Sequence, residues 1–289
     1  MIDSSSTFKL LDTHLHLVYR KKFDYSWVEG IPALEKSDFT IEDYRSIVGP
    51  SGVEKAIFME TATDEQFFKD ETHFVLSLAE ELSNKIIGVI ASCRPEKNNF
   101  EFDKWLAETK DTKVLGFRRI LHTEADELST SQTFRDNINK IGEQEKSFDL
   151  CVLEKQLPFA IELARACDNT QMVLNHCGIP NIATGDFNYW AKHISQLSQL
   201  PHVNCKISGV IAYCPADQGN ADTLRPYIEH CVDSFGWDRL LWGSDWPVCN
   251  LAKGVSDWVT IFNQLLAQEN VETQDKISKQ NAKRIYNLI

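Results

Sequence analysis

The sequence predicts one (β/α)8 barrel domain over residues 1–289. It contains about eight short, almost continuously apolar runs, with helix-length amphipathic segments between them. Such runs are typical of parallel strands that are buried on both faces, and eight of them close a barrel. No repeat, low-complexity tract or linker divides the chain, and barrels of about 250 residues routinely form one domain.

The expected elements follow one another in the order that this fold requires. The strands are predicted at 8–15, 55–59, 86–91, 114–121, 149–153, 172–175, 203–207 and 240–243. Helices are clearest at 65–82, where Thr63 and Asp64 are expected to cap the first turn, at 154–166, where Pro158 fits only near the start, and at 274–287. The aromatic-rich insert 18–51 is longer than an ordinary βα connection, and we expect it to act as a lid.

Composition narrows the class of partner. The net charge of -12 argues against nucleic acid and anionic membranes, which require concentrated Lys and Arg. No apolar run approaches the roughly 20 residues that span a bilayer, and the first residues lack a signal-peptide pattern. We therefore expect a cytoplasmic protein that binds a small molecule, and the sequence leaves open whether it forms a homo-oligomer. The eight scattered cysteines form no Cys-x-x-Cys pair and are expected to be core residues.

The most informative motif is Asp12-Thr13-His14-Leu15-His16, together with Asp245 in Gly243-Ser244-Asp245-Trp246-Pro247. Alternate side chains of a strand share a face, so His14 and His16 can hold one metal ion or one substrate oxygen between them. Active sites of α/β barrels lie at the C-terminal ends of the strands, where Asp245 follows the last strand. We therefore predict that these three side chains meet at the barrel mouth, with Asp12 deeper, either as an orienting group or as part of the pocket wall.

The same rule selects further candidates. His176 follows the sixth run, although a single histidine at a strand end is more often structural. Strand parity sends Arg118 and Arg119 to opposite faces, and we expect Arg118 to enter the barrel as a clamp for an anion or a carbonyl. Lys206 is expected to bind substrate or to pair with a barrel carboxylate. The weaker candidates for the pocket are Glu60, Trp27, Tyr213, Ser208 and Trp246, the last of which is equally expected to pack in the core.

The remaining histidines carry less information. They are predicted to lie in helices or at helix ends, with a surface or structural role: His73, His193, His202 and His230. His122 comes just after the fourth run, and its role is left open.

These motifs resemble the amidohydrolase superfamily, and more narrowly its branch of lactonases that act on sugar acids and related compounds. The resemblance covers essentially the whole chain and rests on the segments 12–16, 116–118, 148–158, 174–178, 205–209, 241–247 and 281–286. It implies a metal-dependent-hydrolase type of barrel. The members with two metal ions carry a bridging Lys or Glu on the fourth strand and a His on the fifth, but this chain has Arg118 and no fifth-strand His.

The resemblance therefore implies one divalent ion, Zn²⁺ or Mn²⁺, held by His14, His16, Asp245 and His176 where the site is occupied. The lactonase branch also includes members without a metal. The expected reaction is lactone hydrolysis, in which Asp245 accepts a proton from water and later protonates the leaving alkoxide. The carbonyl oxygen would be stabilised by the ion or, without one, by the three histidines and Arg118.

Substrate identity and two rival functions stay open at this point. A hydroxyl-rich sugar-acid lactone is favoured over a polycarboxylated lactone, which would require several pocket arginines. The rivals are a metal-dependent non-oxidative decarboxylase, whose relatives carry a fifth-strand His, and a catalytically silent sugar-binding barrel.

Overall fold

The computed structural model describes residues 9–35, 37–183, 186–215 and 217–288. Eight parallel strands stand in chain order, and each is hydrogen-bonded to the next. The strands are β1 (Leu10–Leu15), β2 (Val53–Met59), β3 (Ile86–Ser92), β4 (Val114–Ile120), β5 (Ser147–Cys151), β6 (Met172–Leu174), β7 (Val203–Ser208) and β8 (Leu240–Gly243).

The ring closes where the end of β8 meets β1. The Asp245 backbone N–H donates to the carbonyl oxygen of His14 at 2.9 Å, and the His16 N–H donates to Trp246 O at 2.8 Å. These bonds continue the parallel ladder past Gly243 into the loop that carries Asp245. The predicted (β/α)8 barrel is confirmed.

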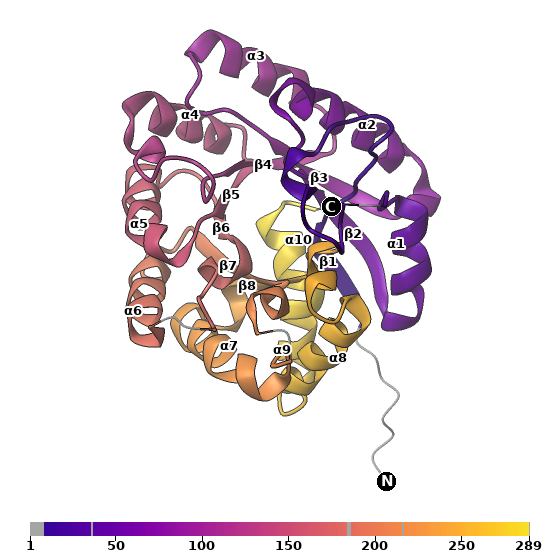
Figure 1. Ribbon diagram of the computed structural model, residues 1–289. Helices are drawn as coiled ribbons and strands as arrows, with labels where there is room; N and C mark the ends of the chain where they lie inside the picture. Colours follow the sequence, from indigo (N-terminus) through magenta and orange to yellow (C-terminus); the bar gives the residue numbers. More distant parts are fainter. Residues whose placement is uncertain (1–8, 36, 184–185, 216, 289) are drawn as a thin grey trace.

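Helices surround the strands as an outer ring (Figure 1). They are α1 (Ile41–Val48), α2 (Phe68–Glu80), α3 (Asn99–Thr109), α4 (Gln132–Glu143), α5 (Leu157–Ala166), α6 (Phe187–Ser198), α7 (Ala221–Phe235) and α8 (Val255–Leu266). The chain ends with α9 (Val271–Asp275) and α10 (Asn281–Ile285). Pro158 lies in the first turn of α5, as predicted. The helix predicted at 274–287 is split into α9, a π-helical segment Lys276–Gln280 and α10.

The differences from the prediction include one strand boundary and one helix cap. The fifth strand is β5 at Ser147–Cys151 rather than 149–153, because the Leu153 N–H bonds to the side chain of Gln156 and the chain turns there into the next helix. The Asp64 carboxylate does not cap the following helix. It accepts hydrogen bonds from the backbone N–H and the hydroxyl of Ser26, at 2.9 and 2.8 Å, and so ties the insert to the loop after β2. Phe8 of the first predicted strand lies outside the described residues.

The barrel interior is closed from the N-terminal side by the last helix. Ala282, Ile285 and Tyr286 pack against apolar side chains from the strands, including Leu11 and Val173. A larger apolar cluster lies between the strands and the outer helices. With one end filled, the C-terminal ends of the strands are left as the place for a site.

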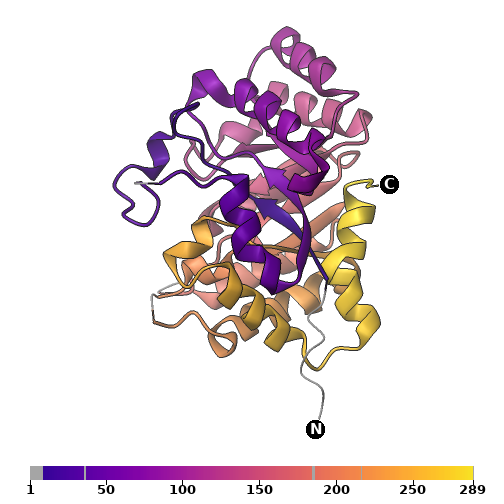
Figure 2. The same ribbon diagram turned by 90° about the vertical axis from the view of Figure 1, so that its right-hand side faces the viewer.

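The insert forms a small structure of its own. Val18 pairs with Phe39 in an isolated antiparallel bridge, and apolar side chains that include Phe23 and Val28 form a separate cluster. Figure 2 shows this segment extending from the barrel on the side away from the C-terminal helices. The predicted range 18–51 also contains α1, which belongs to the outer ring. Its role as a lid stays a prediction.

Within the described residues, no helix is long and apolar enough to span a membrane. All eight cysteines are free thiols, and seven of them are buried, in line with the expected core role.

Candidate active site at the barrel mouth

His14, His16 and Asp245 come together at the mouth. His14 Nε2 and His16 Nε2 are 3.1 Å apart, and Asp245 Oδ1 lies 3.6 Å and 3.3 Å from these two nitrogens. All three side chains are buried, with at most 7% of each exposed. His176 joins them from the turn after β6, with Nδ1 3.7 Å from Asp245 Oδ2. The structure thus brings together the side chains that the sequence predicts to converge.

Asp12 holds the β1–β8 junction rather than the pocket wall. Its Oδ1 accepts hydrogen bonds from the backbone N–H groups of His14 and Ser244, at 3.0 and 2.8 Å, and Oδ2 accepts from the hydroxyl of Tyr44 in α1 at 2.6 Å. The β1–β2 register shifts between Asp12 and Leu15, which breaks the simple alternation expected along β1. Of the two roles left open for Asp12, this placement matches the orienting group.

The position of the Asp245 carboxylate depends on Gly209, which directly follows β7. The Asp245 backbone has φ 59°, in the left-handed region that non-glycine residues rarely adopt and that is often found at functional sites. Gly209, with φ +53°, lies so close that an added Cβ would be 2.2 Å from Asp245 Cβ and 2.3 Å from Oδ2. Any side chain at Gly209 would therefore displace the carboxylate.

We expect Gly209→Ala to lower catalytic efficiency by about 100-fold or more, since a displacement of about 1 Å at a reacting group costs this much. The change in kcat/KM is the measurement. Gly236→Ala is the matched control, because Gly236 also has positive φ, +68°, but no heavy atom lies within 4 Å of its added Cβ. Equal effects of both substitutions on activity would show that backbone strain, and not crowding of Asp245, is responsible.

Hydrogen bonds assign the tautomers of the histidines. His16 Nδ1 lies 3.0 Å from the carbonyl oxygen of Met59, and His176 Nδ1 lies 2.9 Å from Ser208 O, so both Nδ1 atoms carry the proton. Arg118 Nη1, which can only donate, lies 3.3 Å from His14 Nε2. All three rings therefore have the lone pair on Nε2.

The electrostatic surroundings favour the neutral form of His14 and His176 and the ionised form of Asp245. Burial lowers the pKa of His14 well below its ordinary value, and the nearby His176 lowers it further. Burial also lowers the pKa of His176, although Asp245 opposes this change. For Asp245, burial by itself raises the pKa, but His176, His16 and Arg118 together hold it below its ordinary value of 3.8. Asp245 Oδ2 is buried and has no hydrogen-bond partner among the described residues.

This donor set fits a divalent cation. Two imidazole nitrogens and a carboxylate oxygen face one another, and the three atoms lie within 4.8 Å of one another. Ligands at about 2.0–2.2 Å from one ion are separated by roughly 3.0–3.6 Å, and the distances of 3.1, 3.3 and 3.6 Å lie in this range. The group formed by His14, His16 and Asp245 could therefore hold one metal ion.

Arg118 points into the barrel, as predicted, but most of its donors are engaged. Nε donates to Glu60 Oε1 at 2.6 Å and Nη2 donates to the carbonyl oxygen of Glu60 at 2.6 Å. Burial by itself would lower the pKa of Arg118, but Glu60 raises it, so the pair stays ionised. Arg119 lies at the edge of the mouth, where Nη2 pairs with Glu96 at 2.9 Å and Glu124 at 3.2 Å.

A cavity of about 590 Å³ opens above this centre. It is lined by His16, His176, Asp245 and Arg118, and also by the predicted candidates Glu60, Trp27 and Tyr213. Trp27 comes from the insert and donates its indole N–H to Thr61 O at 2.8 Å. His14 lies behind this lining and is fully buried.

Three predicted pocket residues lie elsewhere. Lys206 is fully buried below the mouth, with Nζ 2.9 Å from both Asp149 Oδ1 and Thr13 O, which matches the alternative of a barrel ion pair and not substrate contact. Trp246 packs in the core against Phe39 and Tyr44, and only 1% of it is exposed. Ser208 is also buried, and binds His176.

Sequence reasoning missed Arg94 and Cys151, which also line the cavity. Arg94 pairs with Glu65 at 2.7 Å and donates to Ser92 Oγ at 2.8 Å. Cys151 lies 3.3 Å from Nδ1 of His122, whose role was left open. The sequence could have indicated both residues through their position at strand ends, since Arg94 follows β3 and Cys151 ends β5.

Two other features lie away from the mouth. The thiols of Cys177, Cys205 and Cys231 form a fully buried group that could also ligate a metal, with Cys205 and Cys231 Sγ 4.0 Å apart. They belong to the apolar cluster between strands and helices, and we assign them a packing role.

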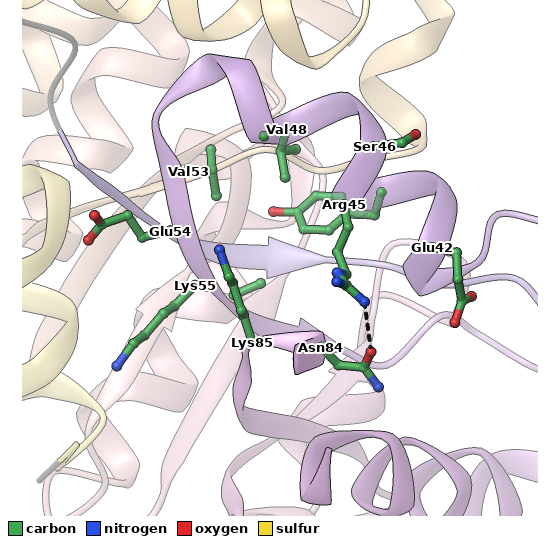
Figure 3. A pocket seen from close by; sticks show the side chains of 12 residues that line it. Glu42, Arg45, Ser46, Val48, Val53, Glu54, Lys55, Asn84 and Lys85 are labelled. Atoms are coloured by element: carbon green, nitrogen blue, oxygen red, sulfur yellow. Dashed lines mark hydrogen bonds between the residues drawn. The ribbon is translucent and has the colours of Figure 1, made fainter. Parts of the chain in front are cut away.

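A cavity of about 480 Å³ lies on the outer wall beside α1 (Figure 3). It is lined by Arg45, Lys55, Lys85 and other side chains, and it shares no lining residue with the cavity at the mouth.

The eight-stranded barrel carries the His14–His16–Asp245 group at the C-terminal ends of its strands, which is where the active sites of barrel enzymes lie. The chain belongs to the amidohydrolase family, a family of hydrolases whose model, described as Amidohydrolase, matches residues 11–288.

The chain is similar to several known proteins, of which three are described here. The chain is 29% identical to an L-fucono-1,5-lactonase of Burkholderia multivorans, over 88% of this chain and 87% of that protein. It is 23% identical to a 4-sulfomuconolactone hydrolase of Rhizobium radiobacter, over 82% and 75% of the two chains. A crystal structure of an amidohydrolase from Burkholderia multivorans with bound zinc is similar, with a TM-score of 0.88, 25% identity and coverage of 97% and 99%.

Proposed function

We propose that this protein hydrolyses the lactone of a sugar acid, with Asp245 as the group that activates water. The observation that carries the proposal is the unpartnered, buried Oδ2 of Asp245 beside the His14–His16 pair, at the floor of a cavity that opens to solvent. The similarity to an L-fucono-1,5-lactonase supports a cyclic ester as the substrate class.

The proposed reaction uses one carboxylate twice. Asp245 accepts a proton from water while the water oxygen bonds to the lactone carbonyl carbon. The tetrahedral intermediate then breaks the bond between that carbon and the ring oxygen. The protonated Asp245 returns its proton to the ring oxygen as it leaves, which gives the open hydroxy acid. The depressed pKa of Asp245 provides the ionised base over the whole neutral range.

The tautomers change the expected source of oxyanion stabilisation. His16 and His176 direct Nδ1 to backbone carbonyl oxygens, and Nε2 of His14 faces the donor Arg118 Nη1, so these contacts do not make the three rings a set of N–H donors for a carbonyl oxygen. Arg118 Nη1 is the donor that remains near His14. We therefore propose that His14, His16 and Asp245 hold one divalent ion, Zn²⁺ or Mn²⁺. Such an ion, when bound, polarises a carbonyl and lowers the pKa of water.

We expect one zinc or manganese ion per chain, and expect His16→Gln to lose it. The metal content of dialysed protein, measured by elemental analysis, checks this expectation. His193→Gln is the control, because His193 bonds to Tyr189 O on α6 and lies outside the cavity. Equal metal content in the wild type and the His16 variant would contradict the assignment of the ligands.

The charges of the cavity favour a neutral substrate. Each lining arginine is already paired with a carboxylate, Arg94 with Glu65, Arg118 with Glu60, and Arg119 with Glu96 and Glu124. No lysine lies among the described lining residues, whereas Asp64 and Asp245 add further negative charge. A polycarboxylated lactone would bring like charges together, but a hydroxyl-rich neutral lactone would not.

We expect kcat/KM for neutral aldono-1,5-lactones to exceed that for a dicarboxylated lactone by about 100-fold or more, because like-charge contacts cost several kcal/mol. Acid release in weak buffer over a lactone panel is the measurement. A preference for the dicarboxylated lactone would contradict the charge argument. The same assay separates the rivals, since a decarboxylase would release carbon dioxide and a silent sugar-binding barrel would release neither product.

A further inference from the structure

His122 and Cys151 form a hydrogen-bonded pair in the cavity wall that the proposed reaction does not use. His122 follows β4 and Cys151 ends β5, and His122 Nδ1 lies 3.3 Å from the thiol Sγ. The adjacent Leu121 N–H donates to Cys151 O at 3.0 Å, which fixes the two strand ends relative to each other. Both side chains line the same cavity as Asp245 and His176.

The pair is not a nucleophilic dyad. A nucleophilic cysteine needs a thiolate, and typical activated cysteines have a depressed pKa beside a protonated histidine. Here burial raises the pKa of Cys151 to about 12, and burial together with Arg118 lowers the pKa of His122 to about 4. Near pH 7 the thiol therefore keeps its proton and the imidazole is neutral.

If both groups are neutral, one arrangement of protons gives a favourable hydrogen bond between them. The imidazole nitrogen is a much better acceptor than sulfur, so the Cys151 S–H donates to Nδ1. His122 then carries its proton on Nε2, which makes no hydrogen bond with any described residue. His122 is half-buried, with its free N–H donor at the wall of a cavity whose arginines are already paired.

We propose that His122 is a specificity residue that donates its Nε2–H to a hydroxyl oxygen of the substrate, with Cys151 selecting the tautomer. This inference rests on the proposed lactone hydrolysis and adds a binding subsite to it. The ligand class is a lactone that carries a hydroxyl group opposite the end of β4. A substrate without that hydroxyl leaves the donor unpaired and is bound less well.

The test compares His122→Phe with His122→Gln on aldonolactones and their monodeoxy analogues. Phe supplies an aromatic ring without an N–H donor, whereas the Gln amide places an N–H near the position of Nε2. We expect Phe to lower kcat/KM by about 10- to 100-fold for the hydroxylated lactone and only slightly for one deoxy analogue. Gln should restore part of the discrimination. Equal losses on every lactone, or no loss, would overturn the inference.

A second readout does not depend on catalysis. The ¹⁵N–¹H spectrum of the His122 ring should show the proton on Nε2 in the wild type and in Cys151→Ser, whose hydroxyl can still donate to Nδ1. A proton on Nδ1 in the wild type would overturn the inference. If the wild type hydrolyses no lactone, the proposed function fails and the subsite fails with it, whereas uniform losses in His122→Phe leave the proposed function standing.

Discussion

Asp245→Asn is expected to lower kcat/KM for lactone hydrolysis by about 10³- to 10⁴-fold and to leave the barrel folded. Asn has the same shape, and the backbone N–H that bonds to His14 O is unchanged. The amide cannot accept the proton of water or return it to the leaving oxygen. The loss therefore falls on the chemical step, and kcat should fall as much as kcat/KM.

Steady-state kinetics with a thermal unfolding curve check this result, and Asp257→Asn in the exposed first turn of α8 is the control. The pH profile gives a second check. Because the pKa of Asp245 lies below 3.8, the wild type should keep its ionised base from neutral pH down to that value and lose activity only in more acidic solution. Lactone hydrolysis within tenfold of the wild type would contradict the role of Asp245.

Lys206→Met is expected to cost about 3–5 kcal/mol in the free energy of unfolding, because it leaves the buried carboxylate of Asp149 without its cation. Lys206 Nζ and Asp149 Oδ1 are 2.9 Å apart, and neither side chain is exposed. Asn175 and Tyr286 also donate to Asp149, at 2.7 and 3.3 Å, but neither of them carries a compensating charge. The melting temperature should fall by roughly 5–15 °C.

Urea and thermal unfolding, followed by circular dichroism, measure the cost. Adding Asp149→Asn to Lys206→Met removes the unpaired charge and should recover much of the loss. Lys155→Met is the matched control, since Lys155 pairs with Asp126 at 3.3 Å while 65% of its side chain is exposed, and we expect a cost below about 1 kcal/mol. A cost for Lys206→Met as small as that of the control would contradict the argument.

Much of the fold was predictable because a parallel barrel strand is buried on both faces. The continuous apolar runs at Ile86 and Leu240 begin where β3 and β8 begin, and the polar residues after each run lie at the mouth. The convergence of His14, His16 and Asp245 followed from the same rule, since each stands at or just after the end of a strand.

Other features depend on contacts that composition and spacing do not contain. The sequence left two roles open for Asp12, and one contact that distinguishes them comes from the hydroxyl of Tyr44 in α1, a helix that strand alternation does not describe. Lys206 lies near the end of its strand and yet bonds to Asp149, because the carboxylate is inside the barrel at that level. Arg94 gave no periodic signal, since its position depends on Ser92 at the end of β3 and on Glu65 after β2.

The closure of β8 onto β1 also determines when during synthesis the His14–His16–Asp245 group is complete. The two histidines are made first and the aspartate more than two hundred residues later, because His14 and Asp245 lie at opposite ends of the strand order. A nascent chain on the ribosome therefore contains only part of the His14–His16–Asp245 group until the final strand docks. Recovery of turnover during refolding should report the completion of the ring, later than the appearance of secondary structure.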